Sequence, residues 1–513
     1  MDVRTQMRSA AAYYAQREAI VAGGRRLTFA QAWQRGIRLA NGLLTLGLRP
    51  QDRVAVLEDN RLESADVFLG AAIANLVRVP LYPRNARDSH EHMMGHTGCR
   101  AVIVDEKYLP EIDGLQAVLP ALEHVIVRDA AYEDWLAVQS AVDPDPPIAP
   151  GDNFILRHTG GTTGKSKGVA YSHRAWLAAA RDWFYLYPPV EPDDACLHLG
   201  PISHGSGYLF MPIWLGGGRN VMVDRFDPAA VLDIFERERI GYLFMVPTML
   251  NAINRVPGIE QRRFPHLKCM LVCAAPIADD TALKAYDIFG PAMYQGYGQT
   301  EVLPVAMMGP AQWFAKDVRG STPLRACGLP LPFAQLQIWD EDNKPVPPGT
   351  PGEIVAKTDG QMTGFWNDPK ATAERMVDGW VKTGDVGYLD ANGYLYMIDR
   401  VGDMIVSGGF NIYPAELENA IAGHPDVVEV AVFGIPHERW GETPCAVCTV
   451  KSGATVTEDA LIELCEEQLG NYKRPGKIVL RDEPLPKTPV GKIKRKDLRE
   501  PFWIGHTRRV AGS

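Results

Sequence analysis

Short apolar runs alternate with longer amphipathic segments between about residues 50 and 310. The short runs are rich in Val, Ile and Leu and are bounded by polar residues, which is typical of buried strands: "DRVAVLED", "AVIVDE", "HVIVRD", "ACLHLG", "NVMVDR", "YLFMVP" and "KCMLVCAAP". The longer segments "SADVFLGAAIANL" and "PAAVLDIFERERI" predict helices. Because strands and helices alternate, we predict an α/β fold with largely parallel sheets covered by helices.

The pattern changes near residue 320, where "FAQLQIWDEDNKPVPPGTPGEIVAK" predicts a strand, a turn and a strand, and hence a smaller β-rich subdomain. It changes again after "GYLYMIDRVGDMIVSGGFNIYP", where two helical patterns and two strands predict a compact α+β unit of roughly 110 residues. We therefore expect a large N-terminal domain over residues 1–399, a hinge over 400–403 and a small C-terminal domain over 404–513.

Composition and charge narrow the class of protein. Of 513 residues, 46% are hydrophobic and 22% charged, and the net charge is −9, which gives no reason to expect binding to nucleic acid or an anionic membrane. No segment approaches the ~20 uncharged apolar residues of a membrane span, and the N-terminal segment lacks the long apolar core of a secretory signal. Cys445 and Cys448 lie three apart in a strand pattern, on opposite faces, so they are poorly placed to share a metal. We expect reduced, buried cysteines and a cytoplasmic location.

A glycine-rich stretch, "HTGGTTGKSKG", occupies residues 158–168. It is not the loop of a P-loop NTPase, because the first glycine of G-x-x-x-x-G-K-[ST] is missing at Thr159. The flanks "NFILRH" and "GVAYS" read as strands, and a helix begins only after Ser172, a good N-cap residue. A strand–loop–strand cannot direct a helix N-terminus at phosphates, so such a loop must bind them through backbone N–H groups, hydroxyls and lysine. A solvated loop without a ligand is the alternative.

Four further motifs follow in order: "YQGYGQTE" at 294–301, "KTGD" at 382–385, "DRVGDMIVSGGFNIYPAELE" at 399–418 and "PKTPVGKIKR" at 486–495. Together with the glycine-rich loop, this set resembles the adenylate-forming superfamily of acyl-CoA synthetases, luciferases and peptide-synthetase adenylation domains. The resemblance covers nearly the whole chain. It implies that the large domain binds ATP and a carboxylic acid, forms an acyl-adenylate with Mg²⁺, and passes the acyl group to coenzyme A.

The resemblance also implies the nucleotide contacts. Family loops read T-S-G-T-T-G-x-P-K-G; here Gly160 replaces the serine, so one hydroxyl is lost, and Ser166 replaces the proline. Tyr297 corresponds to the aromatic residue that stacks on adenine, and a core tyrosine is the alternative. Glu301 corresponds to the Mg²⁺ ligand, because hard oxygen ligands suit that ion. The expected ATP-binding residues are Thr159, Gly161, Thr162, Thr163, Gly164, Lys167, Ala275, Tyr297, Gly298, Thr300, Asp385 and Arg400, with Asp385 on the ribose hydroxyls unless it is only a turn residue.

The C-terminal motifs correspond to a mobile catalytic unit. Lys492, in "PVGKIKR", matches the family's catalytic lysine, whose ammonium can bridge the carboxylate and the α-phosphate; a solvated basic face is the alternative. In the family, the small domain rotates about a residue two positions after the arginine of the 399–418 motif, usually Asp or Lys. Here that residue is Gly402, which departs from the family pattern. The alternative is that Gly402 is an ordinary loop glycine without a hinge role. For CoA we expect contacts from Gly408, Gly409, Trp440 and Arg474. The alternative for Trp440 is that it is a buried residue that anchors the fold.

The pocket for the acid is predicted from "GPISHGSGYLF" and the motifs around it. No acidic residue opens this segment to pair an α-amino group, which argues against an amino-acid substrate. The expected pocket residues are His204, Gly205, Tyr208, Ala274, Gly296, Val302 and Leu303, with His204, Thr300, Glu301 and Lys492 as catalytic residues. These residues are mostly small or apolar, and no arginine or lysine is among them to pair a second carboxylate. We therefore favour an apolar monocarboxylic acid: fatty, alicyclic or aromatic. Transfer to a carrier protein, a luciferase-like oxygenation and nucleotide binding without turnover remain alternatives, and the oligomeric state is open, a homodimer included.

Overall fold

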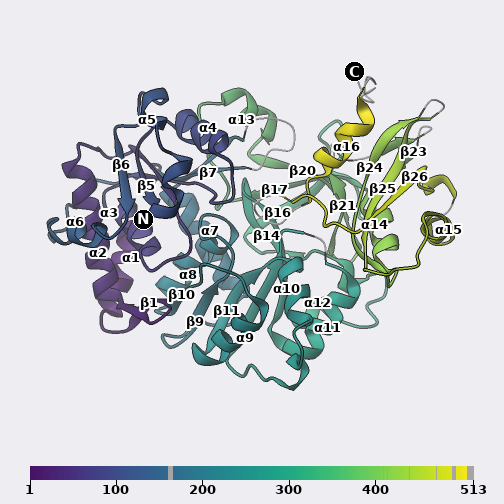
Figure 1. The fold of residues 1–513 in the computed structure, drawn as a ribbon, viewed down its shortest axis with the longest axis horizontal. Helices are drawn as coiled ribbons and strands as arrows, with labels where there is room; N and C mark the ends of the chain where they lie inside the picture. The colour runs from purple at the N-terminus through teal and green to yellow at the C-terminus, as the bar shows by residue number, and fades with distance from the viewer. Residues whose placement is uncertain are drawn as a thin grey trace.

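The computed structural model describes residues 1–159, 166–275, 277–400, 403, 405–407, 410–412, 414–437, 440–469, 471–487 and 493–504. Figure 1 shows a large body, from the N-terminus to the β-rich strands, beside a smaller body that contains the C-terminal elements. Four sheets organise the described residues.

The first sheet has nine strands, and its central strands are parallel. Only its edges are antiparallel: β2 pairs with β1 at one edge, and β14 and β15 follow β13 at the other. Its strand order is β15 (Leu329–Pro330), β14 (Val302–Met308), β13 (Met293–Gln299), β12 (Cys269–Cys273), β11 (Ile240–Met245), β9 (Ala195–His198), β10 (Arg219–Met222), β1 (Glu18–Ala22) and β2 (Arg25–Thr28).

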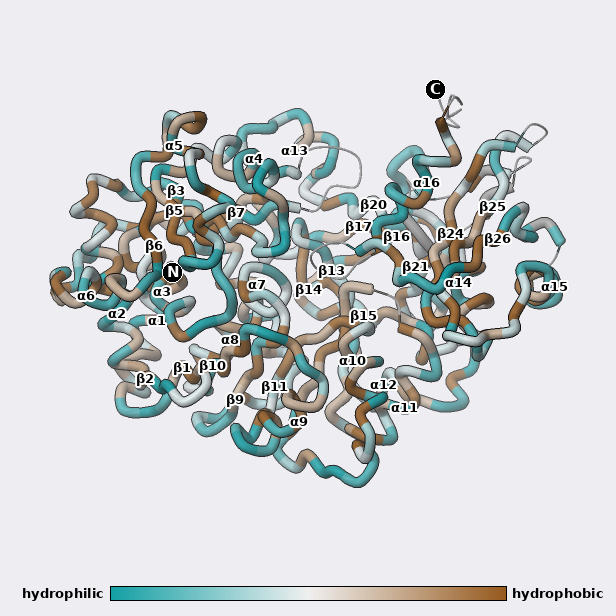
Figure 2. The backbone as a smooth tube through the Cα atoms, viewed as in Figure 1, coloured by the Kyte–Doolittle hydropathy of each residue, from teal (hydrophilic) through white to brown (hydrophobic). Residues whose placement is uncertain are grey.

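The second sheet has seven strands, and it is parallel except where β8 pairs with β7 and β18. Its strand order is β18 (Gly364–Phe365), β8 (Gly168–Ser172), β7 (Asn153–His158), β4 (Val77–Pro80), β3 (Arg53–Leu57), β5 (Cys99–Asp105) and β6 (His124–Arg128). A hydrophobic segment coincides with the buried strand β5 (Figure 2). Both parallel sheets confirm the α/β fold predicted from the alternating pattern.

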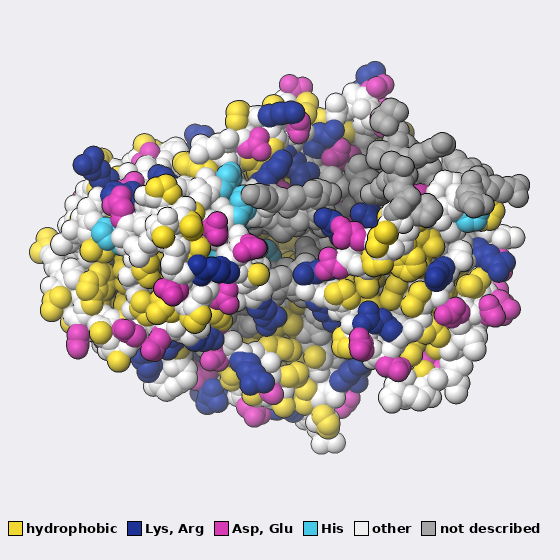
Figure 3. Space-filling view, turned by 45° about the horizontal axis from the view of Figure 1, so that its top comes forward, with side chains coloured by type: hydrophobic (Ala, Val, Ile, Leu, Met, Phe, Trp, Pro, Cys, Tyr) yellow, Lys and Arg dark blue, Asp and Glu magenta, His cyan; other side chains and the backbone are white. Residues whose placement is uncertain are grey.

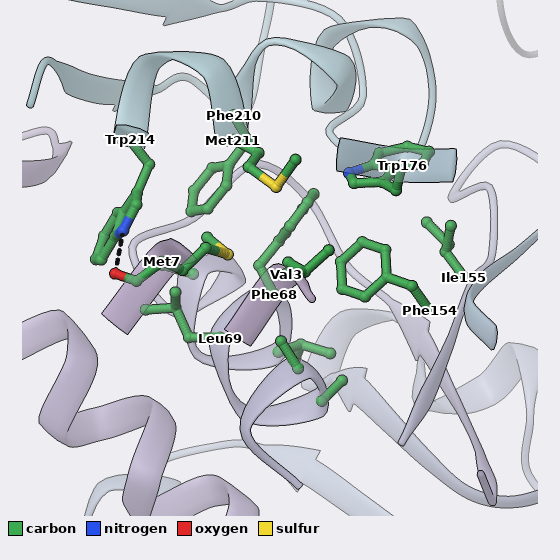
Figure 4. Packing of buried hydrophobic residues seen from close by; sticks show 14 of the residues in the cluster. Val3, Met7, Phe68, Leu69, Phe154, Ile155, Trp176, Phe210, Met211 and Trp214 are labelled. Carbon is green, nitrogen blue, oxygen red and sulfur yellow. Dashed lines mark hydrogen bonds between the residues drawn. The ribbon is translucent and has the colours of Figure 1, made fainter. Parts of the chain in front are cut away.

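Helices fill the space between the first two sheets and hold the main hydrophobic core. They are α1 (Val3–Tyr13), α2 (Phe29–Thr45), α3 (Ser64–Ile73), α7 (His173–Leu186) and α8 (Phe210–Leu215). Figure 4 shows the middle of this core, where Met7 of α1, Phe68 of α3, Trp176 of α7 and Trp214 of α8 converge. The indole of Trp214 donates to the carbonyl of Met7 at 3.0 Å, so the buried N–H is satisfied.

The outer faces of the two sheets are also covered. The first sheet is covered by α9 (Pro228–Arg237), α10 (Pro247–Asn254) and α11 (Asp279–Phe289), and the second by α4 (Arg87–Thr97) and α5 (Leu115–Val118). Three short helices lie at the periphery: α6 (Tyr132–Ala137), α12 (Pro310–Trp313) and α13 (Pro369–Arg375). Burial on both faces explains why these strands are apolar throughout instead of alternating.

The third sheet is antiparallel and forms the predicted β-rich subdomain. It consists of β16 (Ala334–Trp339), β17 (Gly352–Thr358), β20 (Trp380–Leu389), β19 (Met376–Val377) and β21 (Leu395–Arg400). Its inner face packs on β14 of the first sheet through Val302, Val305, Ala356 and Val381. This contact fixes the third sheet against the large parallel sheet.

The fourth sheet belongs to the small C-terminal domain. Its strands are β22 (Ile405–Ser407), β23 (Phe410–Ile412), β24 (Val427–His437), β25 (Gly441–Val450) and β26 (Lys477–Arg481), with α14 (Pro414–Ala422), α15 (Glu458–Leu469) and α16 (Arg495–Trp503). Cys445 and Cys448 of β25 are buried in two different clusters, on opposite faces, as the alternation of a strand predicts. The helices in the described ranges are all too short or too polar to cross a membrane.

Candidate active site

A cleft of about 3360 Å³ opens where the large body meets the small domain, at the carboxyl ends of β11, β12 and β13. Figure 3 shows the surface hollowed there, with Lys and Arg side chains around the opening. In parallel sheets, ligands typically bind at these strand ends. The cleft brings together these predicted residues: Thr159, Lys167, His204, Gly205, Tyr208, Ala274, Ala275, Gly296, Tyr297, Gly298, Thr300, Glu301, Leu303 and Asp385.

The glycine-rich loop connects two antiparallel strands, as predicted. His158 of β7 pairs with Gly168 of β8, and the N–H of Thr159 donates to the carbonyl of Lys167 at 3.0 Å, which closes the base of the loop. Helix α7 begins after Ser172, whose hydroxyl accepts from the N–H of Ala175. Gly161, Thr162, Thr163 and Gly164 lie outside the described residues, so their phosphate contacts remain a prediction.

Lys167 lies at the rim of the cleft. Its ammonium is 3.8 Å from a carboxylate oxygen of Asp368 and 5.2 Å from the ring centre of Phe365. Because the Lys167 side chain is 46% exposed, this ion pair holds the lysine weakly. A phosphate entering the cleft can therefore compete for it.

Three histidines that the sequence reasoning missed lie beside the base of the loop. The rings of His92, His96 and His158 have centroid separations of 5.6, 6.3 and 5.7 Å. His92 Nε2 donates to the carbonyl of Ser166 at 2.8 Å and so ties the loop to α4. Burial, with the neighbouring His96 and His92, lowers the pKa of His158 to about 3. His158 is therefore neutral at physiological pH.

Asp385 is held by two donors from one face of β13. The hydroxyl of Tyr297 donates to Asp385 Oδ2 at 2.7 Å, and the amide of Gln299 donates to the same oxygen at 2.6 Å. The N–H of Asp385 donates to the hydroxyl of Thr383 at 3.1 Å. Asp385 is only 3% exposed but still borders the cleft. The carboxylate is thus held in one position by donors of the protein itself.

Tyr297 acts here as a hydrogen-bond donor to Asp385, whereas its stacking on adenine stays a prediction. Burial, and then the charge of Asp385, raise the pKa of Tyr297 well above its ordinary value, so its hydroxyl remains a donor. Tyr297 packs against the cluster that contains Val302 and Val305, and it also borders the cleft. Gln299 was missed, although its spacing of two from Tyr297 in a strand places both on one face.

Arg400 is brought to the same place by the third sheet. In the β20–β21 ladder, Arg400 pairs directly with Asp385. This register agrees with the predicted assistance of Arg400 at the ribose, but the Arg400 side chain is outside the described part of the structure.

Thr300 and Glu301 follow β13 at the cleft wall. The hydroxyl of Tyr171 donates to the carbonyl of Thr300 at 2.8 Å, and the N–H of Met362 donates to the carbonyl of Glu301 at 2.9 Å. These bonds fix the backbone of Thr300 and Glu301 at the cleft wall. The carboxylate of Glu301 is 3.5 Å from the guanidinium of Arg375, which also donates to the carbonyl of Lys382 at 2.9 Å.

The donor set of Glu301 suits Mg²⁺. Within the described ranges, no group of three or more His, Cys, Asp or Glu side chains could hold a metal by itself. Mg²⁺ is commonly held by one or two carboxylates together with substrate phosphates. Among the described residues, the Glu301 carboxylate forms one long ion pair, with Arg375 at 3.5 Å. Arg375 is a further residue that the sequence did not reveal, because it lies 74 residues from Glu301 and outside every motif.

The predicted acid pocket is lined mainly by apolar groups. His204, Gly205 and Tyr208 lie at and within a short 3₁₀ helix (Gly205–Tyr208), and a Cβ atom on Gly205 would lie 2.7 Å from the ring of Phe244. Glycine is therefore required for the close approach of these two segments. Leu303 and Gly296 border the same space.

Val302 does not line the cleft. It is fully buried with Val305, Ala356 and Val381 on the side of β14 opposite to Leu303, because successive residues of a strand face opposite sides. The structure thus removes Val302 from the pocket residues.

A buried arginine lies behind the pocket, although the sequence suggested no cation near it. The guanidinium of Arg157 stands 4.1 Å from the ring centre of Tyr208 and donates to the carbonyl of Ser203 at 2.9 Å. Arg157 is absent from the cleft lining, so it supports Tyr208 from behind.

The turn after β12 carries local strain. Ala274 has a φ of 74°, which is uncommon for a residue with a side chain, and it stands with Ala275 at the cleft surface. Such conformations persist where the surrounding structure determines them and are frequent at functional sites.

The expected CoA residues remain a prediction. Trp440 is 45% exposed and stacks on His437 at 4.3 Å, so it is not the buried anchor considered as its alternative. Arg474 pairs with Glu466 at 3.2 Å on the small domain. Neither residue lines the cleft in this arrangement. Gly402, Gly408, Gly409 and Lys492 lie outside the described residues.

Comparisons with known proteins agree with this geometry. Residues 7–366 match a family model described as AMP-binding enzyme, and residues 416–492 match the AMP-binding enzyme C-terminal domain. The chain is 35% identical over 490 residues to a feruloyl-CoA synthase of an Amycolatopsis species, covering 94% of this chain and 95% of that protein. It is 31% identical over 511 residues to the fatty acid–[acyl-carrier-protein] ligase ScoC of Streptomyces coeruleorubidus, covering 97% and 96%. The structure of ATP-bound MatB from Rhodopseudomonas palustris superposes with a TM-score of 0.89 at 27% identity, covering 99% and 100%.

Proposed function

Since the chain belongs to the AMP-binding enzyme family, as an AMP-forming acid–thiol ligase, we propose that it is an ATP-dependent acyl-CoA synthetase for an apolar monocarboxylic acid. The observation that carries this proposal is the positioned Asp385, held by Tyr297 and Gln299 in the cleft that also contains Thr300, Glu301 and the base of the glycine-rich loop. A nucleotide and an acid can meet there.

In the first step, a carboxylate oxygen attacks the α-phosphorus of ATP, the bond to the β-phosphate breaks, and pyrophosphate leaves with its electron pair. Asp385 would accept hydrogen bonds from the ribose hydroxyls, and Thr300 would contact the α-phosphate. Lys492 would supply the positive charge between the carboxylate and the phosphate. Positioning and electrostatic stabilisation are the main contributions in phosphoryl chemistry of this kind.

Glu301 would hold Mg²⁺ together with phosphate oxygens, and the bound ion would neutralise charge on the phosphates. Arg375, at 3.5 Å from Glu301, orients that carboxylate toward the cleft. His204, at the entrance of the acid pocket, would position the acid beside Thr300.

In the second step, the CoA sulfur attacks the acyl carbonyl carbon, the thiol proton is lost, and AMP leaves. Lys492 must withdraw before CoA arrives, so we propose that the small domain rotates at 400–403. Trp440 and Arg474 are then candidates for the CoA wall, because rotation would present a different face of the small domain to the cleft.

The acid is proposed to be apolar because Phe244, Leu271, Leu303 and Leu209 line its side of the cleft. Purified protein should release pyrophosphate and form thioester with a subset of fatty, alicyclic, benzoic and cinnamic acids. Each reaction is measured with and without CoA, and Asp385→Ala should raise the KM for ATP much more than that for the acid. Failure of every acid to support pyrophosphate release would refute the proposal.

Transfer to a carrier protein is the second candidate, and the match to a fatty acid–[acyl-carrier-protein] ligase favours keeping it. Adenylation would then proceed without CoA, and thioester would form only with phosphopantetheinylated carrier protein. A direct comparison of CoA with a carrier protein as acceptor, at equal acyl-adenylate, separates the two.

A further inference from the structure

Arg375 is a cation of the cleft that lies outside every sequence motif. It is the last residue of α13, it lines the cleft, and 30% of its side chain is exposed. Its Nη2 is 3.5 Å from the carboxylate of Glu301, and its Nη1 donates to the carbonyl of Lys382 at 2.9 Å. A guanidinium has five N–H donors, and these two groups are its partners among the described residues. Donors of Arg375 therefore remain for a ligand in the cleft.

The guanidinium lies beside two segments that the proposed function assigns to the nucleotide. One is Glu301, which is proposed to hold Mg²⁺ on the phosphates. The other is Gly384, directly before Asp385, where a Cβ atom would lie 3.1 Å from Arg375 Nη1. Gly384 also has a φ of 70°, which favours glycine. A nucleotide with its ribose at Asp385 and its phosphates at Glu301 would therefore carry its phosphate chain past Arg375.

A second cation lies at the other end of the same helix. Asp368 is the N-cap residue of α13, and the ammonium of Lys167 is 3.8 Å from its carboxylate. Seven residues separate Asp368 from Arg375, which corresponds to about 10 Å along the helix axis. Ala371, four residues before Arg375 and hence on the same helix face, also lines the cleft. Lys167 and Arg375 thus stand at the two ends of a helix face that borders the cleft, an arrangement that suits an extended polyanion.

We propose that Arg375 is a further catalytic residue, whose guanidinium binds the β- and γ-phosphates of ATP and the pyrophosphate formed from them. This inference rests on the proposed function and adds a phosphate contact to that site. When the bond from the α-phosphorus to the bridging oxygen breaks, the electron pair goes to that oxygen, and negative charge grows on the departing pyrophosphate. The planar guanidinium fork matches pairs of phosphate oxygens, so Arg375 would stabilise this charge.

The alternative is that Arg375 acts only through Glu301, by orienting that carboxylate for Mg²⁺. The two roles differ when the metal is absent, so inorganic pyrophosphate is titrated calorimetrically in magnesium-free buffer with EDTA. Arg375→Gln should bind pyrophosphate roughly 10–100-fold more weakly than wild type, because the lost hydrogen bonds are to a charged group. A role through Glu301 alone predicts equal affinities without Mg²⁺ and a difference only in its presence. That result, or no binding of pyrophosphate by wild type, overturns the inference.

AMP serves as the second ligand, because it has the ribose and the α-phosphate but no β- or γ-phosphate. The affinity of Arg375→Gln for AMP should stay within about threefold of wild type. Equal losses for AMP and pyrophosphate would mean that Arg375 only supports the backbone at Lys382, and would overturn the inference.

Arg237→Gln is the matched control. Arg237 also ends a helix, α9, and its Nε is 3.3 Å from the carboxylate of Glu238, outside the cleft. This variant should bind pyrophosphate and AMP as wild type does. A loss of pyrophosphate affinity equal to that of Arg375→Gln would refute a specific contact at Arg375.

Turnover with any acid that reacts gives a kinetic check. Arg375→Gln should raise the KM for ATP and the inhibition constant of pyrophosphate roughly 10–100-fold, and leave the KM for the acid within about threefold. Arg375→Lys keeps the positive charge without the fork, so its values should lie between those of Arg375→Gln and wild type. If no acid reacts, the proposed function fails, and the calorimetry still decides on Arg375. Equal pyrophosphate affinities overturn this inference even where adenylation proceeds.

A measurement on wild-type protein keeps the inference testable if the variants do not fold. Phenylglyoxal modifies exposed guanidinium groups, and mass spectrometry identifies the modified arginines. Pyrophosphate should protect Arg375 from modification and leave the modification of Arg237 unchanged. Equal modification of Arg375 with and without saturating pyrophosphate would overturn the assignment.

Discussion

Removing the Tyr297 hydroxyl tests whether this residue positions the nucleotide site or only stacks on adenine. Tyr297→Phe keeps the ring and deletes the donor that lies 2.7 Å from Asp385 Oδ2. A stacking role predicts an almost unchanged KM for ATP. A positioning role predicts a higher KM, because Asp385 Oδ2 would lose the Tyr297 donor that holds it together with the amide of Gln299.

The magnitude follows from the type of bond. A hydrogen bond to a charged group is worth about 1.5–3 kcal/mol. Part of this appears as lost stability, since Asp385 is 3% exposed and its carboxylate remains buried. If about half appears in nucleotide binding, the KM for ATP rises roughly 3–13-fold, as each 1.4 kcal/mol is tenfold. The value of kcat should change less than about threefold.

The assay is pyrophosphate release at saturating acid, with ATP and with 2′-deoxy-ATP as nucleotides. Wild-type protein should prefer ATP, and Tyr297→Phe should narrow this preference because Asp385 is less well positioned for the ribose. Since burial and Asp385 keep the pKa of Tyr297 well above its ordinary value, the change should be the same from pH 6 to 9.

A matched control is available in the same subdomain. The hydroxyl of Tyr396 donates to Asp390 Oδ2 at 3.0 Å, and neither residue lines the cleft. Tyr396→Phe should cost a similar amount of stability and leave the KM for ATP unchanged. The reasoning is refuted if Tyr297→Phe, shown to be folded, matches this control in KM and in its preference for ATP.

Three other predictions concern catalysis, the hinge and stability. Lys492→Ala should slow adenylation ~10²–10³-fold and spare thioester formation from supplied acyl-adenylate. The control variant Lys451→Ala, at an exposed lysine, should affect neither half-reaction. Equal loss of both half-reactions in Lys492→Ala would contradict the role of Lys492. Gly402→Pro fixes φ near −65° and should uncouple the two half-reactions, adenylation and thioester formation, when each rate is measured by quenched flow. If both rates stay within about twofold of wild type, Gly402 is not the pivot. Burial lowers the pKa of His173 and His198 to about 4, so in acid the unfolded chain binds the protons first and stability falls as pH drops from about 6.5 toward 4. Between pH 7 and pH 5, the free energy of unfolding measured in urea melts should fall by about 2 kcal/mol less in His198→Asn than in wild type. An equal fall in both proteins would contradict this linkage.

Much of the fold could be predicted because burial on both faces gives parallel strands continuous apolar runs. The strands β3, β5, β6, β9, β10, β11 and β12 occupy the predicted segments. The glycine-rich loop was also predictable as strand–loop–strand, since its flanks lack a helical pattern until Ser172. These inferences depend only on local sequence, where periodicity and capping residues act directly.

Contacts between distant segments could not be predicted in the same way. Tyr297 and Asp385 are 88 residues apart, and Glu301 and Arg375 are 74 apart. A motif gives the type of residue at each position but not the partner that it faces in another sheet. The position of Gln299 could have been predicted, because residues two apart in one strand face the same side, and Gln299 is two residues after Tyr297.

The misplaced Val302 explains how these distant residues meet. Val302 was predicted to line the acid pocket, and its neighbours along the chain, Glu301 and Leu303, do border the cleft. Instead it is fully buried against Ala356 of β17 and Val381 of β20. This apolar contact fixes the third sheet on the edge of the first and brings Asp385 within hydrogen-bond distance of Tyr297. The polar geometry of the cleft therefore depends on the packing of a residue that points away from it.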